Sequence, residues 1–205
     1  MASDLREPIR FLQLENARLT EENHDLREEI ETLRQVLDAM IVLQDISTSI
    51  TSKTNILGLL DRILESALKA ISATGGSLIL IDEDTRELVF TVVHGSARES
   101  LVNYRLPQGT GIAGWVAQHF ESVIIPNARL DPRFSSTVDN LFHFETHTMM
   151  CVPIATSNRM LGVITALNKN NNREFTPTDL ALFAVVAQLA ATAMERAEHV
   201  TAEPQ

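Results

Sequence analysis

The residues most suited to chemistry form a glycine-rich run, Gly109-Thr110-Gly111-Ile112-Ala113-Gly114, directly before a predicted short helix over 115–120. Exposed amides at a helix N-terminus can hold an anion such as a phosphate. The spacing is not that of a dinucleotide-binding fingerprint, and no strand–helix–strand unit surrounds it. A tight strand-to-helix turn uses the same residue types. The run is therefore either an anion site or a turn.

Two histidines lie four residues apart in the segment His143-Phe144-Glu145-Thr146-His147. Side chains at this spacing share a face only on a helix, and this segment leads into a predicted strand. In zinc proteases the glutamate directly follows the first histidine, which is not the case here. We therefore predict no metal site. Haem held by one histidine, with His94, His143 or His147 as candidates, has no dedicated motif.

The chain has one cysteine, Cys151, inside a predicted apolar strand. It cannot form an internal disulfide, which suits a reducing compartment. No histidine neighbours it in the sequence, so we expect a buried, inert thiol. Because no set of nucleophile, base and orienting group can be assembled, we predict that the chain is not an enzyme.

Length and composition allow one domain of ordinary size with an extension: 205 residues, 44% of them hydrophobic, with a net charge of −10. An acidic chain with scattered Lys and Arg lacks the basic stripe that contacts phosphates, so we expect no nucleic-acid partner. There is no uninterrupted apolar run of about eighteen residues and no signal peptide. We therefore expect a cytoplasmic protein with no membrane partner.

The N-terminal segment carries a seven-residue repeat. Its a positions are Ile9, Asn16, Asn23, Ile30 and Leu37, and its d positions are Leu12, Leu19, Leu26, Leu33 and Met40. Glutamates at g precede arginines at e by five residues, the spacing that joins parallel, in-register helices; the pairs are Glu22 with Arg27 and Glu29 with Arg34. We predict that residues 1–50 form a parallel coiled coil that makes a homodimer. A lone solvated helix is the alternative.

The rest of the chain predicts an antiparallel sheet with helices. Strands are expected at 77–81, 87–94, 101–106, 122–125, 149–154 and 161–167, with Gly75-Gly76 opening the sheet. The two most apolar strands, 149–154 and 161–167, should form a central hairpin. Amphipathic helices are expected at 56–71 and 177–199. The first has Leu57, Leu60, Leu64 and Leu68 on one face, and the second has Leu180, Phe183, Ala184, Ala187, Ala191 and Met194 on one face. The 126–145 segment reads as a structured loop with room for one helical turn.

Several of these motifs together resemble the GAF domain, the small sensor module of cyclic-nucleotide phosphodiesterases, adenylyl cyclases, histidine kinases and bacterial enhancer-binding regulators. The resemblance spans 56–197 and rests on Gly111-Ile112-Ala113-Gly114-Trp115, Cys151-Val152-Pro153-Ile154, Leu161-Gly162-Val163-Ile164, Asn168-Lys169, Phe175 and Asp179. It implies an α+β, PAS-like fold with a central antiparallel sheet flanked by helices over 51–199, followed by a tail at 200–205.

The resemblance also implies a ligand site. In nucleotide-binding members the ligand lies against the helix start, the equivalents of Asp139 and Thr146 touch it, and Ser77 is near the base. The predicted ligand-binding set is Ser77, His94, Gly111, Ile112, Ala113, Trp115, Phe134, Asp139, Thr146 and Thr165. A second set, Asn168, Lys169, Phe175 and Asp179, is expected to hold the loop over the pocket. The Lys169–Asp179 pair is better explained as a structural clip.

Taken together, these patterns predict a stand-alone GAF sensor that binds a small molecule between the sheet and the 126–145 loop and signals to an unidentified downstream protein. Cyclic AMP or cyclic GMP is the expected ligand. Three departures weaken the case for cyclic GMP in particular: Leu180 replaces a motif Glu, Thr165 stands where cyclic-GMP binders often have Glu, and Ser135 stands where an aromatic residue can stack. The alternative is a ligand-free dimerisation scaffold. A polar, open pocket favours the sensor, and one filled by its own side chains favours the scaffold.

Overall fold

The computed structural model describes residues 10–23, 56–96 and 98–202. The chain divides into two compact units, residues 1–40 and 41–205. The predicted boundary after residue 50 falls outside the described residues.

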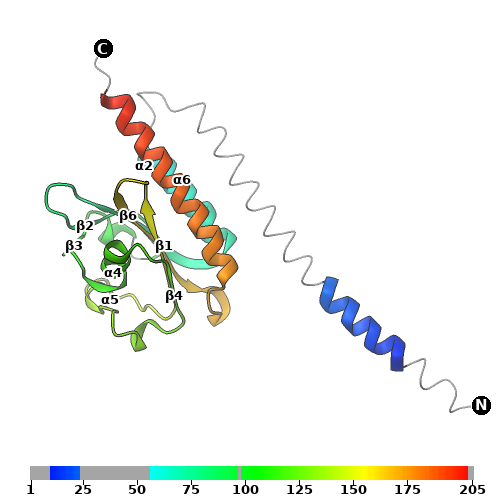
Figure 1. Ribbon diagram of the computed structural model, residues 1–205. Helices are drawn as coiled ribbons and strands as arrows, with labels where there is room; N and C mark the ends of the chain where they lie inside the picture. Colours follow the sequence, from blue (N-terminus) through cyan, green and yellow to red (C-terminus); the bar gives the residue numbers. More distant parts are fainter. Residues whose placement is uncertain (1–9, 24–55, 97, 203–205) are drawn as a thin grey trace, which may run out of the picture. The chain divides into compact units, whose positions relative to one another are not determined.

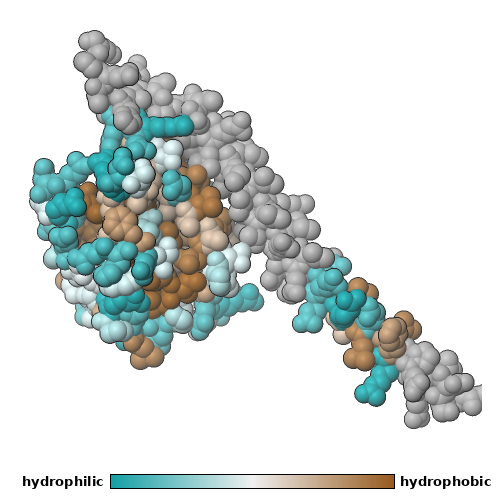
Figure 2. All heavy atoms as spheres, viewed as in Figure 1, coloured by the Kyte–Doolittle hydropathy of each residue, from teal (hydrophilic) through white to brown (hydrophobic). Residues whose placement is uncertain are grey.

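In the first unit, residues 10–23 form a helix. Leu12 and Leu19, two of the predicted d positions, are 64% and 51% exposed, and both hydrophilic and hydrophobic residues reach the surface of this helix (Figure 2). Arg18 pairs with Glu15 and Glu22 along the same helix. Exposed apolar side chains at d positions are what a coiled-coil seam presents without its partner. The parallel dimer stays a prediction, and the heptad positions beyond residue 23 lie outside the described residues.

The second unit is built on a six-stranded antiparallel sheet with the order β3-β2-β1-β6-β5-β4 (Figure 1). The strands are β1 (Ala73–Ile81), β2 (Leu88–His94), β3 (Arg105–Leu106), β4 (Val123–Ile125), β5 (Met149–Ala155) and β6 (Met160–Lys169). The hairpin predicted at the centre is confirmed, because β6 lies between β1 and β5. Its apolar side chains are buried on both faces of the sheet.

Two helices, α2 (Ile56–Ala70) and α6 (Pro177–Ala202), lie side by side over one face of the sheet (Figure 1). Most of the residues predicted for the inner faces are buried, and Leu57 and Ala184 are the two that are exposed. The α6 residues that are buried are Leu182, Phe183, Val186, Ala187, Ala190, Ala191 and Ala193. The small alanine side chains let the two helices approach closely.

Helix α6 begins with a capping box. The backbone N–H of Thr176 donates to Asp179 Oδ2 at 2.7 Å, and the N–H of Asp179 donates to Thr176 Oγ1 at 3.2 Å. Among the described residues, the Pro177–Glu198 part of α6 is long and apolar enough to cross a membrane by length and composition. In this fold seven of its side chains belong to the domain core, so it serves as a cover for the sheet.

The other face of the sheet carries shorter elements: α3 (Arg98–Leu101), α4 (Gly111–His119), η1 (Ala128–Leu130) and α5 (Thr137–Phe142). The short η2 (Asn170–Asn172) connects β6 to α6. The predicted strand over 101–106 is mostly turn, with only two residues in β3. The helix predicted from Trp115 starts four residues earlier, at Gly111. The loop over 126–145 holds both η1 and α5, more helix than expected.

Gly75 and Gly76 lie inside β1 and do not open the sheet. A Cβ atom on Gly76 would lie 2.3 Å from the carbonyl oxygen of Thr165 and 2.7 Å from Cδ2 of Leu68. Glycine is therefore required here for the close approach of β6 and α2, and not for a turn.

Candidate ligand-binding site

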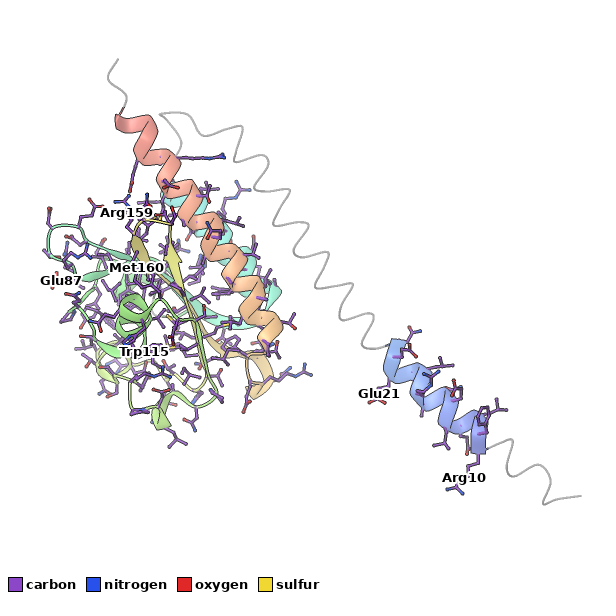
Figure 3. All side chains as sticks on the ribbon, viewed as in Figure 1. Arg10, Glu21, Glu87, Trp115, Arg159 and Met160 are labelled. Carbon is purple, nitrogen blue, oxygen red and sulfur yellow. The ribbon has the colours of Figure 1, made fainter. Side chains whose placement is uncertain are left out.

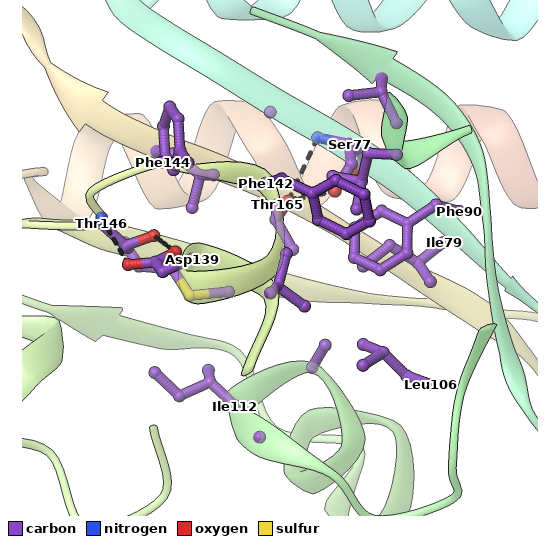
Figure 4. Close-up of a pocket in the computed structure, with 18 of the residues that line it drawn as sticks. Ser77, Ile79, Phe90, Leu106, Ile112, Asp139, Phe142, Phe144, Thr146 and Thr165 are labelled. Carbon is purple, nitrogen blue, oxygen red and sulfur yellow. Dashed lines mark hydrogen bonds between the residues drawn. The ribbon is translucent and has the colours of Figure 1, made fainter. Parts of the chain in front are cut away.

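A cavity of about 100 Å³ lies between the sheet and the elements on its open face. Its lining comes from β1, β2, β6, the start of α4 and the loop over 126–146, and apolar side chains supply most of it. Four phenylalanines contribute to the lining: Phe134 and the three labelled in Figure 4, which are Phe90, Phe142 and Phe144. Pockets that hold drug-sized ligands measure roughly 300–1,000 Å³. A nucleotide-sized ligand therefore needs the loop over the cavity to move outward.

Nine of the ten residues predicted for the ligand site line this one cavity: Ser77, His94, Gly111, Ile112, Ala113, Phe134, Asp139, Thr146 and Thr165. Five further residues line the cavity but were not predicted from the sequence: Phe90, Phe142, Phe144, Met149 and Leu167. Met149 and Leu167 sit directly opposite each other in β5 and β6. The alternation of side chains along these strands was the signal that could have placed them on the cavity face.

Trp115, the tenth predicted residue, does not line the cavity, which corrects the prediction. Because α4 begins at Gly111, its buried side is formed by Ile112, Ala113 and Val116. Trp115, labelled in Figure 3, instead stacks on the His119 ring with the ring centroids 4.3 Å apart. The Arg133 guanidinium lies 4.5 Å from the centroid of the Trp115 ring. A cation–π contact of this kind stabilises by about 0.5–1 kcal/mol. Trp115 therefore contacts the loop that covers the cavity through Arg133.

The glycine-rich run is a tight turn that places the start of α4 at the cavity. Gly109 and Gly111 have φ angles of 76° and 68°, in the left-handed region. Gly114 is packed against that turn, since a Cβ there would lie 2.4 Å from the Gly109 carbonyl carbon. Thr110 to Ala113 line the cavity. The first amides of a helix lack intrahelical acceptors and carry the positive end of its dipole, so this wall suits an anionic group.

Asp139 and Thr146 form a buried hydrogen-bonded pair across the loop, with 7% and 3% of their surfaces exposed. The Thr146 backbone N–H donates to Asp139 Oδ2 at 2.8 Å, and its hydroxyl donates to Asp139 Oδ1 at 2.8 Å (Figure 4). Both carboxylate oxygens therefore already accept a hydrogen bond. The pair fastens α5 to the chain just before β5.

Ser77 and Thr165 form a second buried pair, on the floor of the cavity. They face each other across β1 and β6, and their hydroxyl oxygens are 2.8 Å apart. Among the described residues, every buried side-chain nitrogen and oxygen has a hydrogen-bond partner. The two buried polar pairs of the cavity are thus satisfied before any ligand arrives.

His94, at the end of β2, connects the cavity with α2. It lines the cavity, and its Nε2 atom lies 3.1 Å from Oδ1 of Asp61 in α2. Arg98 approaches the same carboxylate at 3.3 Å. A ligand that displaces His94 would therefore change a contact made by α2.

The other candidate histidines lie elsewhere. His143 follows the end of α5 with a φ of 51°, and His147 is exposed and within 3.8 Å of Glu145. They do not share a helix face, because α5 ends at Phe142. In the described part of the chain, no three His, Cys, Asp or Glu side chains gather where they could hold a metal ion.

None of the predicted clip residues lines the cavity, and only one of them reaches the loop. Asn168 Oδ1 accepts the backbone N–H of His147 at 2.7 Å, and its Nδ2 donates to the Glu145 carbonyl at 2.6 Å. Lys169 pairs with Asp179 at 2.5 Å, which joins the end of β6 to the start of α6. Phe175 is buried, with 4% of its surface exposed. Asn168 therefore fastens the end of the loop, while Lys169 and Asp179 act on the helix.

Cys151 is fully buried in β5. Burial raises the pKa of its thiol far above the ordinary value, because the apolar surroundings disfavour the charged thiolate. A nucleophilic role for this thiol is therefore not supported.

The model of the GAF domain family matches residues 55–194, most of the second unit. This protein belongs to the GAF family. GAF domains are small-molecule-binding sensor domains of signalling proteins, and the α+β fold predicted from the sequence is the one observed here.

Curated relatives of this GAF protein include phosphodiesterases. It is 30% identical over 176 residues to dual 3',5'-cyclic-AMP and -GMP phosphodiesterase 11 of Drosophila melanogaster, covering 79% of this chain and 12% of the relative. It is also 30% identical over 146 residues to the probable 3',5'-cyclic phosphodiesterase pde-5 of Caenorhabditis elegans, covering 67% and 20%. The chain thus spans a fifth or less of the length of these relatives.

Solved structures show the same fold. The GAF domain of a phosphoenolpyruvate-protein phosphotransferase from Coxiella burnetii superposes with a TM-score of 0.69 at 21% identity, covering 82% of this chain and 98% of that one. The free methionine-R-sulfoxide reductase of Neisseria meningitidis, solved with its substrate, gives a TM-score of 0.62 at 19% identity, covering 78% and 90%. At this identity the likeness concerns the fold alone.

Proposed function

We propose that this GAF domain is a sensor whose cavity binds a cyclic nucleotide, cyclic AMP or cyclic GMP. The observation that carries the proposal is that one apolar cavity combines the start of α4 with two buried polar pairs. Amides at a helix start suit the anionic cyclic phosphate. Aromatic and aliphatic walls suit a planar purine, and the paired polar groups suit its edges. The dual 3',5'-cyclic-AMP and -GMP phosphodiesterase among the relatives supports the same ligand class.

Entry of the ligand requires the loop to open, and the contacts of the loop determine which part of it can move. Its two ends are fastened together: the Ala128 N–H donates to the His147 carbonyl at 2.7 Å, and Asn168 holds the segment at Glu145. The residues between them carry the movable contacts, namely the Asp139–Thr146 pair and Arg133 against Trp115. The section between the fastened ends is therefore the lid.

Transmission runs through His94 and α2 in this proposal. A ligand against His94 changes its contact with Asp61, and α2 packs against α6. Such a change biases the packing of the two helices, an element that a partner can read. The N-terminal helix would place two such domains in a homodimer, and a downstream protein would receive the signal.

The test uses Trp115, the one tryptophan of the chain, which lies against the lid through Arg133. Titration with cyclic AMP or cyclic GMP should change its fluorescence, with 5'-AMP as the control nucleotide. In thermal unfolding, ligand at about a hundred times its dissociation constant adds about 2.7 kcal/mol, which raises Tm by roughly 5–10 °C for a chain of this size. Absence of both effects with both cyclic nucleotides would refute the proposal.

A matched pair of variants locates the ligand at α4. Ser135 lines the cavity, and its Cβ lies 3.6 Å from where a Cβ on Gly111 would be. Ser135→Glu puts a negative charge beside the start of α4 and should abolish binding of the anionic ligand. Ser136→Glu makes the same change at an exposed neighbour that does not line the cavity, and should bind like the unaltered protein.

A second candidate is the ligand-free scaffold, which the size of the cavity favours. The four phenylalanines leave about 100 Å³, so the cavity is closer to filled than to open. An unchanged Tm with both nucleotides, together with a stable dimer by light scattering, would support the scaffold over the sensor.

A further inference from the structure

Ser77 and Thr165 form a buried hydroxyl pair at the cavity, and their hydrogen bond can run in either direction. Both residues line the cavity and are 3% and 2% exposed. The two hydroxyl oxygens are 2.8 Å apart, and either can donate to the other. Thr165 Oγ1 also accepts the backbone N–H of Ser77 at 3.1 Å. This bond keeps the Thr165 oxygen in place whichever way the hydroxyl protons point.

Two proton arrangements follow from these contacts. In the first, Thr165 donates to the Ser77 carbonyl oxygen, 3.4 Å away, and Ser77 donates to Thr165 Oγ1. Ser77 Oγ then offers lone pairs to the cavity and acts as an acceptor. In the second, Thr165 donates to Ser77 Oγ, and the Ser77 proton is free to act as a donor. The arrangements differ only by rotation of two O–H bonds, with no movement of heavy atoms.

The other buried hydrogen-bonding groups of the cavity have a fixed direction, whereas the reversible Ser135–Thr137 hydroxyl pair is exposed. Both oxygens of Asp139 accept hydrogen bonds from Thr146, so this pair can offer a ligand only further acceptor capacity on the carboxylate. The amides at the start of α4 can only donate. Within the buried lining, the Ser77–Thr165 pair can thus form a hydrogen bond with either a donor or an acceptor on the ligand.

The pair lies where it could contact the base of a bound nucleotide, on the side of the cavity away from the start of α4. In Figure 4, Ile112 at the start of α4 and the Ser77–Thr165 pair lie on opposite sides of the cavity. A nucleotide with its phosphate at α4 therefore directs the edge of its base towards the pair. The six-position of that edge carries an amino group, a donor, in cyclic AMP and an oxo group, an acceptor, in cyclic GMP.

We propose that the Ser77–Thr165 pair makes this site accept cyclic AMP and cyclic GMP with comparable affinity, by reversing its hydrogen bond to suit each base. The inference rests on the proposed function, since it concerns the same cavity. A carboxylate on this floor would accept only and would favour one base. A hydroxyl pair loses little with either base, because each arrangement leaves every buried proton with an acceptor.

The first measurement is the dissociation constant of each nucleotide for the full chain, by calorimetry and Trp115 fluorescence. We expect the two constants to lie within about tenfold, which is 1.4 kcal/mol. A larger preference for either nucleotide would overturn the inference while leaving the proposed function intact. Binding of neither would overturn both. The two failures are therefore distinguishable.

Three variants test the mechanism. In Thr165→Val the Ser77 proton loses its partner whenever the ligand donates, so cyclic AMP should weaken about tenfold relative to cyclic GMP. Thr165→Ser keeps a hydroxyl and should keep the ratio of the unaltered protein. Ser77→Ala removes the group that faces the ligand, so both affinities should fall while their ratio stays. An unchanged ratio in Thr165→Val, with folding verified by thermal unfolding, would overturn the inference.

Discussion

The buried pair of Asp139 and Thr146 should contribute measurably to the stability of the domain. Hydrogen bonds to a charged group contribute about 1.5–3 kcal/mol each, and a buried donor left without an acceptor costs about 1–3 kcal/mol. Asp139→Ala removes the acceptor of both the Thr146 N–H and its hydroxyl. We expect a loss of about 3 kcal/mol, within the range at which single buried networks break. Thr146→Val removes only the hydroxyl bond and should cost about half as much.

The assay is thermal and urea unfolding followed by Trp115 fluorescence, which reports on the GAF domain because the chain has no other tryptophan. A loss of about 3 kcal/mol corresponds to a fall in Tm of roughly 6–12 °C. The double variant should be less destabilised than the sum of the single variants, with a coupling energy of about 1–2 kcal/mol.

The control is Glu145→Gln, which removes a carboxylate at an exposed position of the same segment, where it lies 3.3 Å from Arg129. An exposed pair of this kind should change stability by no more than about 0.5 kcal/mol. The reasoning fails if the coupling between Asp139 and Thr146 is below about 0.5 kcal/mol, or if the control loses as much stability as Asp139→Ala.

Three further predictions concern other parts of the domain. Gly114→Ala should lower stability by more than about 3 kcal/mol and lower Tm accordingly, because its Cβ would lie 2.4 Å from backbone that cannot move aside; a Tm within 2 °C of the original would contradict this. Cys151 should resist iodoacetamide at pH 8 in the folded protein and react once guanidinium unfolds it, since burial raises the pKa of the thiol; prompt labelling of folded protein would count against this. Hydrogen bonds from the Thr85 backbone and from Arg105 lower the pKa of Asp82 to about 2. The stabilisation of the folded domain by the ionised Asp82 should therefore be present above about pH 4 and disappear as the pH falls towards 2. The Tm difference between the original protein and Asp82→Asn should shrink over that window, and a constant difference would argue against it.

The sequence predicted the parts of the fold whose local pattern agrees with their tertiary role. The apolar runs of β5 and β6 with a polar turn between them define a central hairpin. The Thr176–Asp179 spacing defines the start of α6. Where a residue type has two structural uses, the local pattern misleads. Gly75 and Gly76 look like a strand boundary, yet β1 continues through them. Residue 76 is a glycine because α2 and β6 approach too closely for a side chain there.

In the candidate site, too, some residues could be predicted from local sequence motifs and others could not. Nine of the predicted residues meet in one cavity, and most of them were placed there by the resemblance to the family, although His94 belongs to no motif. Trp115 falls outside because the actual start of α4 sets which side of the helix faces inward. Phe90 and Phe142 were missed because their place in the cavity depends on β2, with its irregular register beside β1, and on α5, a helix shorter than two turns. Neither feature leaves a periodic signal in the sequence.

The fastened ends of the lid have a consequence for how this domain can diversify. Ala128 and His147 are joined by a backbone hydrogen bond, and Asn168 anchors the same point to β6. The entropy of closing a loop grows only with the logarithm of its length, about 0.6 kcal/mol for each doubling. Residues can therefore be added to or removed from the lid at little energetic cost to the sheet. Changes in lid length could then alter which ligands fit, while the floor of the cavity on β1 and β6 stays the same.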